Sequence, residues 1–408
     1  MPQNEYRVYG YRWVVLALYM GVTALNQLLW ITFAAITSDA AGYYQVSDLS
    51  IGLLSLSFMA VFIVVSIPAS WAIDTWGLRI AVGIGAVLTG AFGLMRGLVG
   101  PSYGLVLAAQ IGIAVGQPFI LNAVTTVAAR WFPLSERATA SGLGTLAAYV
   151  GIALGLALTP WLAARADMSG MLLVYGAVAA AVAVAYLALA RERPPTPPCP
   201  PGQDTRALVF DGLGRALRNR QFQVLLVVLF VGLGVFNGAT TWIEDILRPR
   251  GFDSAQAGIA GGLMVVGGVV GALVIPTLSD RAHKRVPYIL LALAGAIPGL
   301  LGVTFATSYG WLLVSAFALG FFLLSAGPIA FQYGAEITYP APEGTTNGLL
   351  ILAGQVSGIL FILGMDALKS TSTGSMTASL LVFAGLLLAG LLLCTRLKES
   401  ALLTQRRG

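Results

Sequence analysis

The sequence predicts an all-α membrane protein with twelve transmembrane helices, arranged as two six-helix halves related by pseudo-symmetry. Three observations favour this fold class: an apolar composition, twelve apolar runs of spanning length, and a weak repeat between the halves. Hydrophobic residues make up 57% of the 408 residues and charged residues only 10%, and the mean hydropathy is +0.84. Because soluble domains carry about 25% charged residues, this composition indicates a surface that faces lipid.

Runs of about 20 apolar residues, bounded by charge, Pro or Gly, are long enough to cross a bilayer as helices. In the first half they fall at 11–37, 51–73, 79–99, 103–130, 138–162 and 170–190. In the second half they fall at 221–247, 254–278, 287–305, 309–337, 344–368 and 375–396. Between them, RERPPTPPCPPGQD carries prolines and charges that suit neither a helix nor lipid. The predicted organisation is a bundle at 1–190, an aqueous linker at 191–220, a bundle at 221–396 and a tail at 397–408.

Lysine and arginine divide unequally between the two sides of this arrangement. With the N-terminus in the cytoplasm, 18 of the 23 Lys and Arg residues fall on the cytoplasmic side and 5 outside, Arg96 among them. Since cytoplasmic loops carry the excess of positive charge, both termini are expected in the cytoplasm. The pI of 9.4 is explained by this topology and does not indicate nucleic-acid binding.

A weak repeat with an offset of 206 or 207 residues relates the halves. Asp74 in WAIDTWGLR corresponds to Asp280 in TLSDRAHKR, and Pro133–Glu136 corresponds to Pro340–Glu343. A loop aspartate can meet the N-terminal dipole of a helix and a nearby arginine, so the paired loops are predicted to latch the halves on the cytoplasmic side. The alternative is a solvated loop that only fixes topology. The candidate gating residues are Asp74, Arg79, Asp280 and Arg281, with Arg130 and Glu336 as an ion pair.

Polar groups near the middle of apolar helices need a reason, because an unpaired amide in hydrocarbon is costly. Asn26 and Trp30 are four residues apart and therefore share a helix face. The candidate substrate-binding residues are Trp30, Gln117, Gln355, Asn26, Gln27, Asn237, Gln332 and Tyr333. For Asn26, Asn237 and Gln332 an interhelical hydrogen bond is an equal alternative. Trp242, near an outer end, is interpreted as an interfacial anchor.

The candidate site lacks charge, since no Asp, Glu, Lys, Arg or His falls near the centre of a predicted span. An aromatic face with amide acceptors suits a small organic cation or a neutral polar solute. No His, Cys or carboxylate cluster is available for acid–base or metal chemistry, so neither catalytic residues, metal ligands nor a cofactor are expected. The expected partners are a small-molecule substrate and the lipid bilayer, without nucleic acid, and the chain is expected to function as a monomer.

The layout and the paired loops resemble the major facilitator superfamily over essentially the whole chain. The first loop keeps Asp74, Gly77 and Arg79 of the pattern G-x-x-x-D-R-x-G-R-[RK], with Thr75 where a basic residue is usual. Such a fold implies two halves in parallel repeat that rock about a central site.

Three segments also resemble the feline leukaemia virus subgroup C receptor-related transporters. They are NQLLWITF in the first span, GQPFILNAVTTVAARWFPLSERATASGLG at 116–144 and EITYPAPEGTTNGLLILAGQVSGILF at 336–361. The resemblance implies choline or ethanolamine movement, or haem export, with a site formed by Trp30, Gln117 and Gln355. The family's aromatic residue of the seventh helix has no Tyr counterpart, since Phe236 or Asn237 stands at that place.

Together these features predict a secondary transporter for a choline-like or other amine cation, working by alternating access in a bacterial cytoplasmic (inner) membrane. Two alternatives stay open. One is an exporter of haem, drugs or organic anions, with or without proton coupling. The other is a non-transporting membrane receptor or sensor, which would need neither mid-depth polar groups in both halves nor paired loops. An enzyme is not predicted.

Overall fold

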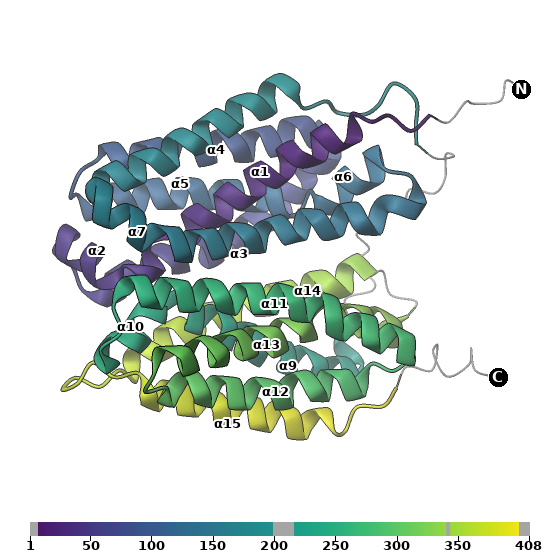
Figure 1. Ribbon diagram of the computed structural model, residues 1–408. Coiled ribbons are helices and arrows are strands. Elements are labelled where there is room, and N and C mark those ends of the chain that lie inside the picture. Colours follow the sequence, from purple (N-terminus) through teal and green to yellow (C-terminus); the bar gives the residue numbers. More distant parts are fainter. Residues whose placement is uncertain (1–6, 199–215, 340–342, 400–408) are drawn as a thin grey trace, which may run out of the picture. The chain divides into compact units, whose positions relative to one another are not determined.

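The computed structural model describes residues 7–198, 216–339 and 343–399, which form helices joined by short connections (Figure 1). The chain divides into two compact units, Met1–Thr205 and Arg206–Gly408. Unit 1 contains α1 (Arg12–Ile31), η1 (Thr32–Ala35), α2 (Thr37–Tyr44), α3 (Asp48–Trp76), α4 (Leu78–Leu98), α5 (Tyr103–Leu121), α6 (Val124–Trp131) and α7 (Leu134–Leu189). Unit 2 contains α9 (Arg220–Thr241), α10 (Ile243–Leu247), η2 (Arg248–Arg250), α11 (Ser254–Ala282), α12 (Val286–Phe305), α13 (Tyr309–Thr338), α14 (Glu343–Ala367) and α15 (Thr377–Cys394).

Within the described ranges, eleven helices are long and apolar enough to cross a membrane. One of them has 55 residues, which as a straight helix would measure about 80 Å against a hydrocarbon thickness of about 30 Å. Asp167 interrupts it with φ 56° and ψ 179°, and its Oδ1 accepts a hydrogen bond from the Gly170 N–H at 2.6 Å. This single element therefore contains the fifth and sixth predicted spans. The prediction of twelve spanning helices is confirmed.

Three of the predicted spans are not continuous helices. The first passes from α1 into the 3₁₀ helix η1 and breaks at Ile36, whose φ is −137° and ψ 36°. The fourth is broken at Asn122 and Ala123, between α5 and α6. Pro118 lies one turn before this break and weakens the hydrogen bonding of the last turns of α5, because proline lacks the N–H and clashes with the preceding turn. The seventh is broken at Trp242, between α9 and α10. These breaks leave backbone carbonyls without helical partners inside apolar units.

Each unit has two ends, which we name by the chain. The terminal end is the one where the first helix of the unit begins, at α1 in unit 1 and at α9 in unit 2, and the far end is the opposite one. At the terminal end of unit 1 the Tyr11 hydroxyl donates to the Leu189 carbonyl at 2.7 Å. This bond ties the start of α1 to the last residue of α7.

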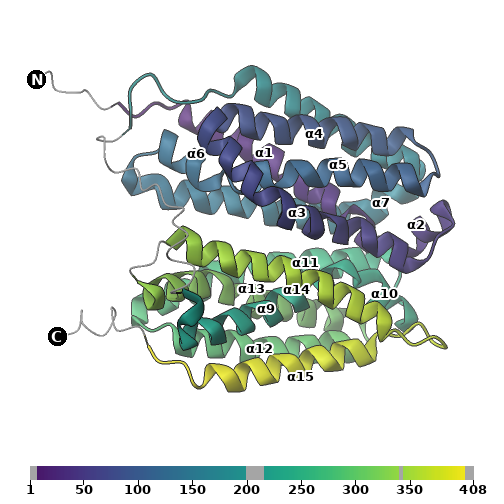
Figure 2. The same ribbon diagram turned by 180° about the vertical axis from the view of Figure 1, so that it is seen from behind.

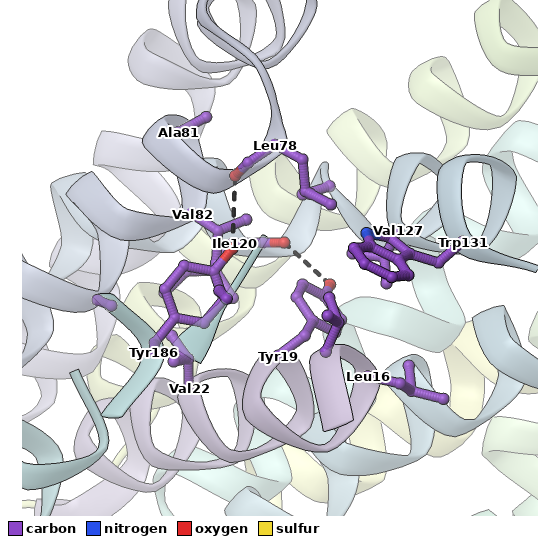
Figure 3. Packing of buried hydrophobic residues seen from close by; sticks show 14 of the residues in the cluster. Leu16, Tyr19, Val22, Leu78, Ala81, Val82, Ile120, Val127, Trp131 and Tyr186 are labelled. Atoms are coloured by element: carbon purple, nitrogen blue, oxygen red, sulfur yellow. Dashed lines mark hydrogen bonds between the residues drawn. The ribbon is translucent and has the colours of Figure 1, made fainter. Parts of the chain in front are cut away.

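A cluster of buried, mainly aliphatic side chains lies in the core of unit 1 between α1, α4, α5, α6 and α7, and it includes the aromatic rings of Tyr19, Trp131 and Tyr186 (Figure 3). The Tyr19 hydroxyl donates to the Ile120 carbonyl at 2.9 Å, and the Tyr186 hydroxyl donates to the Leu78 carbonyl at 3.5 Å. Both rings are 1% exposed. A buried tyrosine needs a partner for its hydroxyl, and here each hydroxyl meets a carbonyl of another helix.

The backbones of α11 and α13 in unit 2 approach unusually closely, and Figures 1 and 2 show these helices side by side. A Cβ added at Gly320 would collide with the Met264 carbonyl oxygen. One added at Gly271 would collide with the carbonyl oxygen of Phe321. Small residues permit such contact between helices in lipid, so glycine at these positions sets the distance between the two helices.

Candidate substrate-binding and gating sites

Trp30 lies in the last turn of α1, where the α-helix passes into η1. Its side chain is 7% exposed, and its Nε1–H donates to the Ser55 carbonyl of α3 at 3.1 Å. This bond uses the edge of the indole and not its face, and the face is the part of the ring that attracts a cation.

Asn26, one turn before Trp30, is completely buried. Its Nδ2 donates to Thr89 Oγ1 of α4 at 3.0 Å and to the Ile113 carbonyl of α5 at 3.4 Å. Gln27 is 4% exposed and donates from Nε2 to Asn26 Oδ1 at 3.4 Å. Asn26 therefore joins α1 to α4 and α5, which is the interhelical alternative given for it, whereas Gln27, among the described residues, bonds only within α1.

Arg96 of α4 is a buried charge that the sequence does not reveal. The residue is 1% exposed, whereas its position three residues before the end of the predicted span 79–99 suggested an outer location. Nη1 donates to the Leu29 carbonyl and to Gln110 Oε1, both at 2.9 Å, and Nη2 donates to Thr32 Oγ1 at 3.3 Å. Gln110 Nε2 in turn lies 3.3 Å from the Leu29 carbonyl and 3.5 Å from that of Trp30.

The charge of Arg96 is compensated without a carboxylate, since within the described part of the chain it forms no salt bridge. Two features take the place of an acid. The guanidinium meets the carbonyls at the C-terminus of α1, where the helix dipole is negative. Its Cζ also lies 5.2 Å from the ring centroid of Phe33, within cation–π range. Arg96 thus holds the end of the helix that carries Trp30.

Gln117 of α5 is buried but has no hydrogen bond. The residue is 5% exposed, and its amide has no hydrogen-bond partner among the residues that the structure describes. Other amides of α5 and its continuation are satisfied. Gln110 bonds to α1 as above, and Asn122 donates to the Ser66 carbonyl at 3.2 Å and to the hydroxyls of Ser66 and Ser70, both at 3.0 Å. Gln117 therefore differs from its neighbours.

In unit 2 the corresponding amides are Asn237 of α9 and Gln355 of α14. Both are half-buried, and neither side chain has a hydrogen-bond partner within the described ranges. The two helices pack together, and a Cβ at Gly354 would meet the Leu233 side chain. Since Asn237 lies one turn after Leu233 and Gln355 follows Gly354, both amides lie close to the contact between α9 and α14.

Two further candidate substrate residues lie toward the terminal end of unit 2. Gln332 is exposed and donates to Glu336 Oε1 at 3.2 Å. The Tyr333 hydroxyl is 2.6 Å from Gln221 Oε1 and 2.7 Å from the Lys398 carbonyl. Tyr333 therefore ties α13 to the start of α9 and to the segment after α15, which is a structural role within this unit.

At the terminal end of unit 1, the carboxylate of Glu192 binds to the start of α4. The Glu192 oxygens accept hydrogen bonds from the backbone N–H groups of Leu78 at 3.0 Å and Arg79 at 2.7 Å, and Arg130 forms an ion pair with the same carboxylate. Two N–H groups at the start of α4 thus meet a negative charge, as the helix dipole favours. Gly77 has φ +91°, and a Cβ there would overlap the Glu192 carboxylate. Both the backbone conformation and the close approach of Glu192 therefore require glycine at this position.

Unit 2 has the same arrangement of a carboxylate and two backbone N–H groups, 207 residues later in the chain. The Glu399 carboxylate accepts from the backbone N–H groups of Arg285 at 2.9 Å and Val286 at 3.1 Å, at the start of α12. The pairs Leu78 with Arg285, Arg79 with Val286 and Glu192 with Glu399 all share the offset of 207. We call these two arrangements the carboxylate clamps.

The Arg285 side chain contacts two further acidic groups at the terminal end of unit 2. It donates from Nη2 to Glu336 Oε1 at 3.1 Å and forms an ion pair with Asp280. Burial alone would lower the pKa of Arg285, but hydrogen bonds to Asp280 and Glu336 outweigh it and raise that pKa above its usual value. The guanidinium therefore stays charged at every physiological pH.

The remaining gating candidates have partners within their own units or none. Asp74 is exposed and makes no side-chain hydrogen bond or ion pair with the described residues. Arg79 donates to the Leu187 carbonyl at 3.0 Å, and Arg281 is exposed. Arg130 contacts Glu192 and Glu336 contacts Arg285, each inside one unit. A latch between the halves, and the pairing of Arg130 with Glu336, stay predictions.

Replacing Glu192 or Glu399 by Gln is expected to destabilise the protein by about 1–2 kcal/mol, because an amide offers one acceptor and no charge to the helix start. Thermal unfolding of the purified full chain measures the loss. Glu136→Gln is the matched control, since its pair with Arg12 at 3.0 Å is partly exposed and such pairs contribute about 0–1 kcal/mol. A loss in Glu192→Gln no larger than in this control would refute a stabilising role for the clamp.

Comparison with known proteins gives concordant results. The model of the Major Facilitator Superfamily matches residues 14–362. Solute carrier family 49 member A3 of Danio rerio is 31% identical over 390 residues, which cover 92% of this chain and 82% of that protein. Choline/ethanolamine transporter FLVCR1 of Felis catus is 29% identical over 420 residues, covering 96% and 74% respectively.

A solved structure matches the fold as well. It is a bacterial homolog of the human lysosomal transporter Spinster in an inward-facing, unoccupied conformation, with a TM-score of 0.71 over 95% of this chain and 96% of that one. At 15% sequence identity this likeness concerns the fold alone.

Two units of spanning helices with polar residues inside them define a multi-pass integral membrane protein of the transporter class, with a small-molecule substrate. The chain belongs to the Major Facilitator Superfamily, with relatives that include the choline/ethanolamine transporters. It is not an enzyme, because members of this family move solutes and do not convert them.

Proposed function

We propose that the protein is a secondary transporter that moves a small amine, of the choline or ethanolamine type, across the membrane by alternating access. Trp30 provides an aromatic face, and Gln117, Asn237 and Gln355 provide amide oxygens. In unit 1 the ring quadrupole and the amide dipole, and in unit 2 the amide dipoles, are groups that attract a cation.

One observation carries the proposal. Gln117, Asn237 and Gln355 lie in spanning helices without a hydrogen-bond partner in the described chain, while Asn26, Gln110 and Asn122 are all satisfied. The side-chain amides of these three residues keep accessible surface, so they are open to a solute. Their hydrogen-bonding groups are available to it because no other described residue engages them. The names of the relatives support an amine as that solute.

The driving force in this proposal is the membrane potential. The distribution of Lys and Arg supports cytoplasmic termini, and the proposed location is a bacterial cytoplasmic membrane, with the monomer as the functional form. A cation that enters a negative interior gains about 2.3 kcal/mol per 100 mV. No proton-binding residue is therefore needed for accumulation.

An organic anion is the second candidate substrate, and Arg96 is the observation in its favour. A buried guanidinium without a carboxylate attracts negative charge. Its two Nη atoms, however, donate to Leu29, Gln110 and Thr32, so they are engaged in holding α1. We therefore favour the amine.

Trp30→Ala is expected to weaken binding of choline or ethanolamine about 30-fold, since a desolvated cation–π contact contributes about 2 kcal/mol. Gln117→Ala is expected to weaken it about tenfold, as one hydrogen bond is lost. The ligand-induced rise in melting temperature of the purified protein, and uptake into vesicles, measure both effects. Trp30→Phe should retain part of the affinity because it keeps an aromatic face.

Trp161→Ala serves as the control, because Trp161 is 55% exposed and lies far from α1 in sequence, beside Arg165. It should leave ligand affinity unchanged. Stabilisation by organic anions but by no amine would overturn the proposed substrate class, and unchanged affinity in both Trp30→Ala and Gln117→Ala would overturn the site.

A further inference from the structure

The far end of unit 2 contains a group of four charged residues where the seventh span breaks. Glu244 and Asp245 of α10 are 2% and 0% exposed, although carboxylates are rarely buried without cations. Arg248 of η2 donates from Nη2 to Asp245 Oδ1 at 3.0 Å. Lys369, two residues after the end of α14, also contacts Asp245.

The ammonium group of Lys369 is held between a carboxylate and an aromatic ring. Its Nζ is 2.7 Å from Asp245 Oδ1 and 5.9 Å from the centroid of the Trp242 ring. The interpretation of Trp242 as an interfacial anchor is wrong, since the residue is 0% exposed and its Nε1 donates to the Ile362 carbonyl at 3.1 Å. The ring is thus fixed inside the unit with its face toward a cation.

An aromatic face beside a carboxylate is the combination that recognises a protonated amine, by cation–π attraction and charge-assisted hydrogen bonds. The 2.7 Å contact requires an N–H donor. A primary ammonium can make it, whereas a quaternary ammonium has no N–H and cannot. The residues that surround Lys369 Nζ therefore already bind the head group of a primary amine, which happens to be attached to the chain.

We propose that Trp242 and Asp245 form a binding subsite for small primary ammonium solutes at the far end of unit 2, and that Lys369 occupies it when no solute is present. The subsite deepens the proposed function and rests on it. An amine such as ethanolamine would displace Lys369 and bind there separately from Trp30 and Gln117.

Displacement of Lys369 does not leave Asp245 without a cation. Arg248 contacts the same carboxylate oxygen and also lies 3.6 Å from Glu244, so the negative charge stays compensated. Lys369 itself is attached to a turn, in which Ser370 accepts from Gly374 and donates to Ser375, and its side chain is 16% exposed. A long, flexible stem in this position can carry the ammonium out to water.

Chemical rescue of Lys369→Ala in the full chain tests the proposal. The variant should melt at a lower temperature than the wild type, because it empties the subsite. Methylammonium should restore the melting temperature with a saturable dose dependence, as expected for a ligand that binds only the folded protein. Tetramethylammonium at equal ionic strength should act about tenfold more weakly, since it lacks the hydrogen bond. Adding Trp242→Leu to Lys369→Ala should abolish the rescue.

Arg250→Ala is the matched control. Arg250 lies in the same 3₁₀ helix as Arg248, but it donates to the carbonyls of Ile246 and Thr304, at 3.0 and 2.9 Å, and not to a carboxylate. Methylammonium should stabilise Arg250→Ala no more than the wild type. Equal rescue of both variants, or equal rescue by tetramethylammonium, would overturn the subsite.

If Lys369→Ala does not lower the melting temperature, binding of ¹³C-methylammonium to Lys369→Ala and to wild type decides the matter. Binding to both proteins, tighter to the variant than to wild type, supports the subsite. Binding to neither refutes the subsite, and binding to the variant alone refutes the displacement of Lys369. These outcomes are distinct from failure of the proposed function, which concerns choline or ethanolamine and the residues Trp30 and Gln117. Rescue of Lys369→Ala, together with an unchanged affinity for choline and ethanolamine in Trp30→Ala, would support the subsite and refute the proposed site at Trp30 and Gln117.

Discussion

Arg96→Met is expected to destabilise the protein by about 3 kcal/mol. Methionine fills much of the same volume but removes the donor to Gln110 Oε1, the donor to Thr32 Oγ1 and one of the two donors to the Leu29 carbonyl. Each buried polar group deprived of its partner costs about 1–3 kcal/mol, and relief from burying a charge offsets part of that sum. Arg96→Lys should lie between methionine and wild type, because an ammonium can replace some of these bonds but not the fork of a guanidinium.

Thermal unfolding of the purified variants measures this loss, with Arg165→Met as control. Arg165 is exposed and lies 3.8 Å from the ring centroid of Trp161, so its removal should cost little. The two variants delete the same side chain from the same unit and differ in burial. Equal stability of Arg96→Met and wild type would show that the hydrogen bonds to α1 contribute nothing net.

Gly320→Ala is expected to lower stability by about 1–3 kcal/mol, the usual cost of overpacking. Its Cβ would overlap the Met264 carbonyl oxygen, and neither backbone can move without separating α11 from α13. Gly385→Ala on α15 is the control, since nothing lies within 4 Å of a Cβ there. That change should instead stabilise by about 0.5–1 kcal/mol, because alanine is the better helix former.

Melting temperatures of the two alanine variants should therefore move in opposite directions from that of the wild type. This contrast separates close helix contact from helix propensity, which both substitutions improve. A melting temperature of Gly320→Ala at or above that of wild type would mean that α11 and α13 adjust to the added methyl group at no cost.

Hydropathy is sufficient to predict the helices, because each span must be apolar over about 20 residues whatever it packs against. The breaks at Ile36, between α5 and α6, and at Trp242 depend on contacts between helices. Of these three breaks, only the one between α5 and α6 is indicated in the sequence, by Pro118. A 3₁₀ turn such as η1 is stabilised by groups from α4 and α5, and no local pattern reveals those partners.

The burial of Arg96 could not be predicted for a similar reason. Three residues from the end of a predicted span, an arginine usually extends to water, and only the fold shows that the Arg96 guanidinium turns inward to the end of α1. The clamps, by contrast, left a detectable pattern. Arg191-Glu192 and Lys398-Glu399 are two basic–acidic pairs with an offset of 207, which is also the offset between Pro133–Glu136 and Pro340–Glu343.

The carboxylate clamps also bear on how such a chain can evolve. Each unit is closed by a residue that follows its own sixth span, so a substitution in one half needs no compensating substitution in the other. The turns have diverged accordingly. Unit 1 uses Gly77 at a φ of +91°, whereas unit 2 has His283 in the left-handed region at φ 52°. Such a pattern is expected of an ancestral six-helix gene that was duplicated and fused, with the carboxylate retained in both copies while the sequences around it changed.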